Sequence, residues 1–252
     1  MQKEIPLLFS TSMVQATKDG RKTKTRRTRG LEEVNANPDN VEFVRFQEYP
    51  DGSLRAIFQQ VIGDEYGSVR CPYGKPGDLL YVREEHYAYG KWVYDGVTKK
   101  TGKLRKKFVS SGEGAYDPYS DYYCFEKFVT GLGKRFELPV EPAGSMLEGW
   151  YKRNSLFMPK EAARIWLEVT DVRVERLQDI SEADAEAEGI ELVEHNCFRN
   201  YNAADPYQYL EDPTGSFRSL WQSINGPESW DANPWVWRIS FKVLSTTGKP
   251  NI

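Results

Sequence analysis

The fold prediction for this chain starts from the segment Gly20-Arg21-Lys22-Thr23-Lys24-Thr25-Arg26-Arg27. Residues 5–9 before it predict a short strand, and residues 10–19 predict a helix that Ser10 or Thr11 caps. Gly20 stands where the glycine that ends a helix is commonly found. A strand, a capped helix and a basic run therefore open the chain in that order.

Positive charge is concentrated in this part of the chain. Residues 18–29 hold seven basic side chains and one acid, although the whole chain has a formal net charge of -3. The helix dipole favours cations at a helix C-terminus, which accounts for Lys18 and its nearest neighbours but not for the bases that follow. Concentrated charge of one sign usually has a partner of the opposite sign. We therefore expect four side chains to contact nucleic acid or another anion: Arg21, Lys24, Arg26 and Arg27.

The composition describes a soluble globular protein. The chain has 252 residues, a charged fraction of 28% and a mean hydropathy of -0.65. No apolar run approaches the roughly 18 residues that span a membrane, and the N-terminus lacks the apolar core of a secretory signal. We therefore expect a cytoplasmic protein with no membrane partner.

The cysteines and histidines argue against a disulfide framework or a metal site. Cys71, Cys124 and Cys197 are far apart, and no Cys-x-x-Cys pair is present. The only histidines are His86 and His195, and the spacing of His195 and Cys197 does not match that of zinc ligands. No metal and no cofactor are predicted.

Further along the chain, strands and helices follow one another in the pattern of an α+β protein. Turn signals and alternating apolar residues predict strands at 41–46, 53–61, 79–87, 165–174 and 235–243. The alternation in 165–174 changes phase near Thr170-Asp171, which predicts a β-bulge. Two late helices are predicted, one from Ser181 to Gly189 and one from Ser216 to Gly226.

Residues 88–160 and 190–215 fit this scheme poorly and are predicted to be insertions in a single domain of residues 1–252. The first insertion is rich in Gly, Tyr and Lys. Its residues 97–108 carry six bases and no acid, and they are followed by Tyr116, Tyr119, Tyr122, Tyr123 and Phe125. A basic hairpin beside tyrosines can follow a nucleic-acid backbone and stack bases. We prefer the interpretation of a solvated insertion packed by its own aromatic residues, because charge runs are usually solvated faces.

Several of these segments together resemble an ASCH domain, a member of the PUA-like superfamily. The matching motifs are Gly20-Arg21-Lys22-Thr23-x-Thr25-x-Arg27, Pro76-Gly77-Asp78-x-Leu80-Tyr81-Val82-Arg83-Glu84 and Ile180-Ser181-Glu182-x-x-Ala185-x-x-Glu188-Gly189. The closing run is similar to the subset of ASCH proteins found in phages and prophages; it reads Trp221…Ile224-Asn225-Gly226…Trp230-x-x-Asn233-Pro234-Trp235-Val236-Trp237. The matches cover both ends and the middle of the chain and leave out the two insertions.

The resemblance implies both a fold and a class of activity. The implied fold is a PUA-like small β-barrel closed by helices, with a ligand cleft between the barrel and the first helix. Relatives in this superfamily bind RNA or modified bases, some are described as ribonucleases, and one ASCH branch hydrolyses the acetyl group from N4-acetylcytidine with a Lys, a Thr and a Glu. By motif position, these three residues are Lys22, Thr25 and Glu188. Those amidohydrolases are far smaller and lack the insertions, so a larger or different substrate is expected here.

The residues themselves are compatible with acyl transfer, which needs a nucleophile, a base and a group that holds the oxyanion. Because neither histidine sits in a motif, a Thr–Lys pair is the available combination. Thr25 is the candidate nucleophile, and Lys22 is the candidate base because neighbouring cations lower the pKa of an amine. Arg27 is the candidate partner of the oxyanion. The alternative is that Lys22 and Thr25 position a phosphate without catalysis.

Glu188 is placed unusually for a carboxylate. It lies in the last turn of its predicted helix, where the helix dipole disfavours an anion, and this suits a group that shuttles a proton. The alternative is a solvated carboxylate in an acidic run. In both cases we expect an exposed side chain whose replacement barely changes thermal stability.

Three functions stay open at this point. The first is a hydrolase acting on a modified nucleoside or on RNA, and the second is a non-catalytic reader of RNA, single-stranded nucleic acid or modified bases. The third is a phage accessory protein that binds a host protein through the insertions. Arg83, beside Glu84, is predicted either to line the anion site or to form a structural ion pair.

Overall fold

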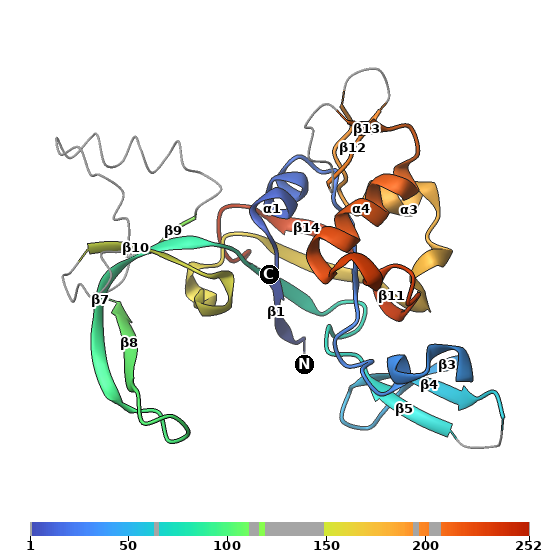
Figure 1. The fold of residues 1–252 in the computed structure, drawn as a ribbon, viewed down its shortest axis with the longest axis horizontal. Helices are drawn as coiled ribbons and strands as arrows, with labels where there is room; N and C mark the ends of the chain where they lie inside the picture. Colours follow the sequence, from blue (N-terminus) through green and yellow to red (C-terminus); the bar gives the residue numbers. More distant parts are fainter. Residues whose placement is uncertain are drawn as a thin grey trace. The chain divides into compact units, whose positions relative to one another are not determined.

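The computed structural model of this chain has a mixed α+β fold (Figure 1). The structure describes residues 2–62, 66–110, 116–118, 149–193, 197–201 and 208–251. Strands outnumber helices in this part of the chain, which confirms the predicted α+β class.

The helices are α1 (Thr11–Lys18), α3 (Glu182–Ala187) and α4 (Pro213–Asn225). The first six strands are β1 (Glu4–Leu8), β2 (Lys24–Arg27), β3 (Val41–Glu48), β4 (Leu54–Gln60), β5 (Tyr66–Arg70) and β6 (Leu79–Arg83). The next four strands are β7 (His86–Val97), which begins just before the first predicted insertion, and β8 (Leu104–Ser110), β9 (Tyr116–Pro118) and β10 (Gly149–Arg153) within it. The last four are β11 (Trp166–Arg176), β12 (Phe198–Arg199), β13 (Tyr209–Leu210) and β14 (Trp235–Ser245).

The chain divides into two compact units. The first unit comprises Met1–Leu7, Gln15–Val82 and Arg164–Ile252, and the second comprises Leu8–Val14 and Arg83–Ala163. The insertion predicted at 88–160 therefore supplies most of the second unit.

A five-stranded sheet in the order β1-β6-β11-β14-β2 lies in the first unit. Strand β14 pairs antiparallel with both β11 and β2. The register of β11 against β14 shifts between Val169 and Asp171, which confirms the bulge predicted at Thr170-Asp171. Strands β1 and β2 are the two edges of this sheet, and the closed barrel that the resemblance implies stays a prediction.

Antiparallel strands β3, β4 and β5 form a second sheet in the same unit. Aromatic rings connect it to β14: the ring centroid of Phe58 lies 5.5 Å from that of Trp235, and Phe46 lies 6.4 Å from Trp237. These tryptophans are therefore part of the packing, as their alternation along the strand predicts.

A hydrophobic core brings the late helices together with strand β14. Its members are Leu177, Ile180, Ala185, Ile190, Phe198, Phe217, Leu220, Trp221, Trp230 and Val236. Burying a large apolar side chain of this kind contributes roughly 1.5–3 kcal/mol. This core therefore holds α3 in place beside the sheet, which matters for the charged residues that α3 carries.

The start of α4 differs from its prediction. The helix begins at Pro213 instead of Ser216, because the Asp212 carboxylate accepts hydrogen bonds from the backbone of Thr214 and Gly215 at 2.9 and 2.7 Å. Proline suits the first position of a helix, since its missing N–H would have no partner there. The end at Gly226 and the Ser181 cap of α3 are as predicted.

The strand predicted at 79–87 is divided in two. Strand β6 ends at Arg83 after pairing with β11, and β7 begins at His86 and pairs with β8, β9 and β10 in a separate sheet. A continuous apolar pattern cannot show that the chain changes its pairing partners at this point, and the sequence prediction of one strand is wrong for that reason. Of the aromatic run in the insertion, Tyr119, Tyr122, Tyr123 and Phe125 lie outside the described residues.

Gly189 occupies a position where a side chain does not fit. Its φ is +84°, and an added Cβ would lie 2.8 Å from the Cβ atoms of both Ala16 and Lys22. Gly20 has a similar φ of +75° but open space around it. An alanine at Gly20 would therefore introduce backbone strain alone, whereas an alanine at Gly189 would introduce the same strain and a steric clash.

We predict that Gly189→Ala lowers the free energy of unfolding by about 2–4 kcal/mol, since strain and overpacking add. Gly20→Ala, which introduces only the strain, is expected to cost about 1–2 kcal/mol. Urea unfolding of the two variants and the parent measures both. Equal losses for the two variants would contradict the close approach at Gly189.

Candidate functional site

Lys22 and Glu188 form a buried ion pair in the first unit. The Lys22 Nζ atom donates to Glu188 Oε2 at 2.8 Å, although the two residues lie 166 positions apart in the sequence. The side chains are 0% and 4% exposed. Backbone pairing between the same two residues, and between Thr23 N and Ala187 O at 2.9 Å, holds them in place. Two of the three predicted catalytic residues are thus in direct contact.

All three hydrogens of the Lys22 ammonium group have acceptors. Besides Glu188 Oε2, Nζ donates to the carbonyl oxygens of Glu188 at 2.7 Å and Lys24 at 3.0 Å. Burial lowers the pKa of Lys22, and the charge and hydrogen bond of Glu188 oppose that shift. The carboxylate therefore favours the charged form of the amine, against the effect of burial.

Arg26 is the second buried cation of the basic run. Its guanidinium group donates to Glu175 Oε1 from Nε at 2.8 Å, to Asp184 Oδ2 at 2.8 Å and to Glu188 Oε1 at 3.3 Å. The Arg26 side chain is 0% exposed, and its guanidinium carbon lies 5.8 Å from the ring centroid of Phe217. Arg26 therefore contacts acids of its own chain. None of its side-chain atoms is exposed to make the expected contact with an external anion.

Two further cations complete a network around Asp184. Lys24 Nζ pairs with Asp184 Oδ1, and Arg238 donates to Asp184 Oδ2 and to Asp171 Oδ2, each at 3.0 Å. We call these residues the charge cluster: Lys22, Lys24, Arg26, Arg238, Asp171, Glu175, Asp184 and Glu188. The cluster holds four cations and four carboxylates, so its formal charges cancel.

The electrostatics of the cluster are visible at Asp184. Partial burial raises the pKa of a carboxyl group, but here hydrogen bonds from Lys24 and Arg26 and the charges of Arg26 and Arg238 outweigh burial. The pKa of Asp184 falls from its ordinary 3.8 to about 2. Asp184 therefore stays ionised throughout the physiological range.

Thr25 is buried but is not part of the charge cluster. Alternation along β2 places Thr25 on the opposite face from Lys24 and Arg26, and in the register it lies beside Ile239. Its side chain is fully buried, and in the part of the chain that the structure describes its Oγ1 atom has no hydrogen-bond partner. The predicted contact between Thr25 Oγ1 and the Lys22 amine is accordingly not a direct hydrogen bond.

The other predicted anion-binding residues lie in different surroundings. Arg21 donates to the carbonyl oxygens of Gly189 at 3.1 Å and Ile190 at 3.3 Å, and it also pairs with Asp19. Arg27 is half-buried and shares the face of Thr25 on β2. Arg83 belongs to the second unit, where it donates to Leu156 O at 3.2 Å.

Glu188 differs from its prediction in exposure. The sequence placed an exposed carboxylate at the end of a helix, but Glu188 is the C-cap residue of α3 and its side chain is 4% exposed. It is buried because the segment that follows α1 pairs with the end of α3 and brings Lys22 and Arg26 against it. The expectation of an exposed side chain is therefore wrong, and the stability expectation that rested on it loses its basis.

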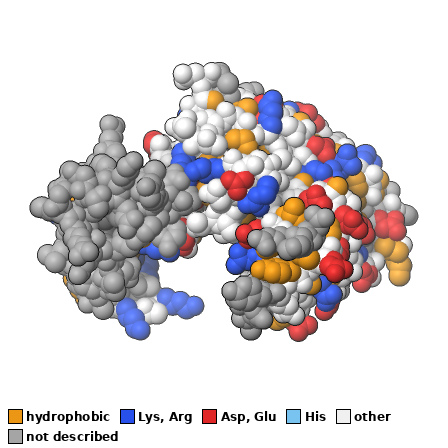
Figure 2. All heavy atoms as spheres, turned by 90° about the horizontal axis from the view of Figure 1, so that it is seen from above, with side chains coloured by type: hydrophobic (Ala, Val, Ile, Leu, Met, Phe, Trp, Pro, Cys, Tyr) orange, Lys and Arg blue, Asp and Glu red, His pale blue; other side chains and the backbone are white. Residues whose placement is uncertain are grey.

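Sequence reasoning did not assign the carboxylates that neutralise the basic run. Asp184 belongs to the acidic run of α3, for which a solvated face is one of the two interpretations above, and Asp171 and Glu175 lie on β11. Their partner Arg238 lies on β14. Charged residues at alternate positions of otherwise apolar strands are a usable signal, since such positions face a buried surface. Over the right-hand part of Figure 2, blue and red side chains lie among one another.

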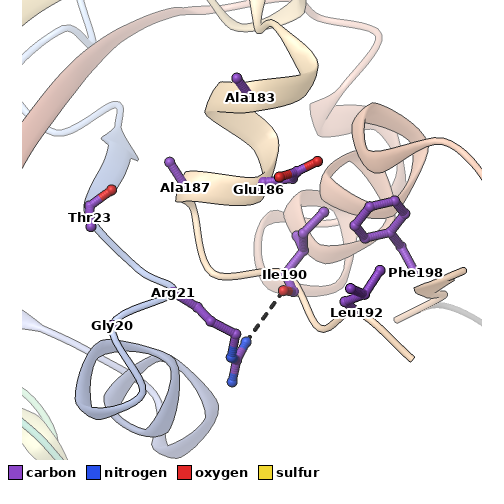
Figure 3. A pocket seen from close by; sticks show the side chains of 9 residues that line it. All are labelled: Gly20, Arg21, Thr23, Ala183, Glu186, Ala187, Ile190, Leu192 and Phe198. Carbon is purple, nitrogen blue, oxygen red and sulfur yellow. Dashed lines mark hydrogen bonds between the residues drawn. The ribbon is translucent and has the colours of Figure 1, made fainter. Parts of the chain in front are cut away.

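A pocket is lined by chain neighbours of Lys22 and Glu188. It has a volume of about 630 Å³ and is lined by Gly20, Arg21, Thr23, Ala183, Glu186, Ala187, Ile190, Leu192 and Phe198. Figure 3 shows Arg21 at its rim, bonded to the Ile190 carbonyl, with the apolar side chains of Ile190, Leu192 and Phe198 grouped beyond. Its size is in the range of small-molecule sites. Lys22, Thr25 and Glu188 do not line it.

Comparison with known proteins adds no assignment, since no family model, no curated protein and no solved structure matches the chain. Within the described ranges, no group of three or more His, Cys, Asp or Glu side chains is arranged to hold a metal ion. None of the helices in that part of the chain combines the length and apolar composition needed to cross a bilayer.

The lowered pKa of Asp184 predicts acid sensitivity. In the unfolded chain Asp184 takes up a proton near its ordinary pKa of 3.8, whereas in the folded protein it does so only near 2. The stabilisation is therefore complete above about pH 5, and about 2 kcal/mol is lost as the pH falls from about 4 to about 2. Urea unfolding at a series of pH values measures this slope. Asp184→Asn is expected to flatten it, and Asp179→Asn, which replaces an exposed acid, is expected to leave it unchanged.

Replacing Glu188 is predicted to destabilise the protein strongly. Glu188→Gln leaves Lys22 and Arg26 buried with one carboxylate fewer, and breaking one side of a buried pair typically costs 3–5 kcal/mol. The matched control is Glu186→Gln, two residues away on the exposed side of α3, which is expected to stay within about 0.5 kcal/mol of the parent. Thermal unfolding that is equal for both variants would contradict the buried pair.

Proposed function

We propose that this protein is a PUA-like, ASCH-type protein that binds a nucleic acid or a modified nucleoside and hydrolyses an amide in it. The alternative substrate in this proposal is RNA, which the protein would cleave by hydrolysis. The proposal includes closure of the five-stranded sheet and its helices into the small barrel that the resemblance implies. A place in the cytoplasm and a phage or prophage origin belong to the same proposal.

The observation that carries the proposal is the direct contact between Lys22 and Glu188. The motif resemblance selects these two residues from opposite ends of the chain, and they meet at 2.8 Å in a buried site. Replacing a buried ion pair with apolar residues is often neutral or stabilising, so such a pair is weak evidence of a purely structural role. Perturbed, buried ionisable groups are concentrated at functional sites.

The proposed chemistry assigns a role to each residue. Thr25 supplies the nucleophilic oxygen, because its buried hydroxyl has no other hydrogen-bond partner in the described part of the chain. Lys22 and Glu188 are the proposed acid–base pair. Thr25 lies on the opposite face of β2 from this pair, so the proposal includes a rearrangement on substrate binding that brings Thr25 Oγ1 within reach of Glu188. Glu188 then takes up the proton of Thr25 and returns it to the departing amine. Water then releases the acyl group from Thr25. Arg27, on the same face of β2 as Thr25, is the proposed partner of the oxyanion.

A second candidate function is a reader that binds without catalysis. The observation that favours a reader is that all three ammonium hydrogens of Lys22 already have acceptors within the chain. A substrate must displace one of these contacts before Lys22 or Glu188 can act on it. A reader needs no such displacement, and the pocket of about 630 Å³ beside the pair is then its proposed site for a base.

Thr25→Val separates the two functions, because it keeps the shape of the side chain and removes only the hydroxyl. Since Thr25 Oγ1 forms no hydrogen bond to the described residues, we predict an unfolding free energy equal to or above that of the parent. We also predict that hydrolysis of an acylated cytidine falls at least about a hundredfold, the usual size of a lost catalytic group. Release of the free acid, followed by chromatography, measures turnover.

The control for this variant is Thr170→Val, which removes an exposed hydroxyl from β11 of the same sheet and is expected to leave turnover unchanged. Thr25→Ser, which keeps a hydroxyl, is expected to retain part of the activity. If the folded Thr25→Val protein hydrolyses as fast as the parent, Thr25 is not the nucleophile. If the parent itself hydrolyses neither an acylated cytidine nor RNA, the reader replaces the hydrolase.

A further inference from the structure

Strands β7 and β8 of the second unit form a long antiparallel hairpin (Figure 1). The turn between them is closed by hydrogen bonds from Thr98 N to Lys103 O and from Gly102 N to Thr98 O, both 2.8 Å long. Every residue from 96 to 107 is exposed, so neither face of the hairpin end is covered by the described residues. A two-stranded hairpin that is open on both sides buries little of its own surface and is marginally stable alone.

The hairpin carries positive charge that the described part of the chain does not neutralise. Residues 91–110 contain seven bases and one acid, Asp95. Asp95 pairs with Arg105 at 2.7 Å. The six other bases have no carboxylate partner among the described residues; they are Lys91, Lys99, Lys100, Lys103, Lys106 and Lys107. This differs from the basic run at residues 20–27, where Lys22, Lys24 and Arg26 all pair with acids.

One face of the same hairpin presents aromatic rings beside these cations. The strand register places Trp92 opposite Phe108 and Tyr94 opposite Lys106, with both pairs on one face. The Lys106 Nζ atom lies 5.9 Å from the ring centroid of Tyr94, which is 54% exposed. An exposed ring beside an exposed cation can stack a base while the cation contacts its phosphate.

Arg153 of the neighbouring strand β10 continues this face. Its guanidinium carbon lies 4.6 Å from the ring centroid of Trp92, 4.5 Å from that of Phe108 and 4.9 Å from that of Phe157. Phe157 is 61% exposed. Cation–π contacts of this kind fix the rings in place, so Phe157 and Tyr94 are two exposed rings with cations close to each.

We propose that the β7–β8 hairpin binds single-stranded nucleic acid, with its unpaired lysines on the phosphates and with Tyr94 and Phe157 stacking bases. A duplex hides its base faces and would leave these rings unused. An acidic peptide would use the lysines but has no planar group for the rings. The proposal does not depend on hydrolysis at Lys22, Thr25 and Glu188, because every residue in it belongs to the second unit.

The first experiment measures binding of fluorescein-labelled oligo(U) and oligo(dT), each of twelve nucleotides, to the full chain by anisotropy at several salt concentrations. Lys103, Lys106 and Lys107 are changed together to Gln. Each phosphate contact of a single strand contributes about 0.7 to the slope of log K against log salt. The triple variant is therefore expected to lose up to about 2 from this slope and to bind about tenfold or more weakly at low salt for both oligonucleotides.

The matched control removes the same charge from bases that already have partners. Arg173, Arg199 and Lys242 pair with Asp171, Glu191 and Glu168. Changing these three to Gln is expected to leave the salt slope unchanged. Equal weakening by the control would show that net charge and not the hairpin governs binding. No weakening by the hairpin variant would show that these lysines do not contact the phosphates. Either result would overturn the proposal.

The second experiment tests stacking. Tyr94→Ala is expected to weaken binding about 5- to 150-fold, the range for one lost base stack, whereas Tyr94→Phe keeps the ring and is expected to bind as the parent does. A twelve-base-pair duplex and poly-glutamate serve as competitors. If either competes better than the single strand, the partner is a duplex or an acidic protein and the proposal fails. If the hydrolysis assay is negative while oligo(U) binding follows these expectations, only the proposed hydrolase is lost.

Discussion

The burial of Lys22 and Arg26 against the carboxylates of α3 and β11 is the constraint on which the first unit depends. These contacts join β2, an edge strand of four residues, to a helix that follows it by more than 150 positions. Removing two cations and their acids from water costs several kcal/mol per ion, so the cluster is tolerable only because almost every charge has a partner of opposite sign. In any neighbouring register between β2 and α3, these buried charges would lose their partners. The desolvation cost therefore excludes those registers.

The register has consequences beyond the charges. Because side chains of a strand alternate, placing Lys24 and Arg26 in the cluster directs Thr25 and Arg27 to the opposite face. Thr25 is thereby buried beside Ile239 without a partner for its hydroxyl in the described part of the chain. A one-residue slip would bring that hydroxyl into the cluster and leave Arg26 among apolar side chains. The charge cluster and the unused hydroxyl are therefore two results of the same register.

Local sequence signals predicted local structure well. The caps at Ser181 and Gly226 and the bulge at Thr170-Asp171 follow from residue preferences and alternation, which act over a few positions. The start of α4 was missed because Asp212 and Pro213 stand before the apolar pattern begins. The partners of Lys24 and Arg26 could not be predicted in the same way, since their carboxylates come from β11 and α3, and pairing at that separation depends on the topology of the sheet. The contact of Lys22 with Glu188 was expected only through the family resemblance.

The chain contains two basic runs that look alike in sequence and differ in the fold. The run at residues 18–29 contacts an acidic helix, and its Lys22, Lys24 and Arg26 are neutralised within the chain. The run at 97–108 lies at the exposed end of a hairpin, where Asp95 is the one acid on β7 and β8 and Arg105 already occupies it. Uncompensated charge of one sign repels itself, and an external anion relieves that repulsion. An external anion is therefore a better partner for the run at 97–108 than for the run at 18–29.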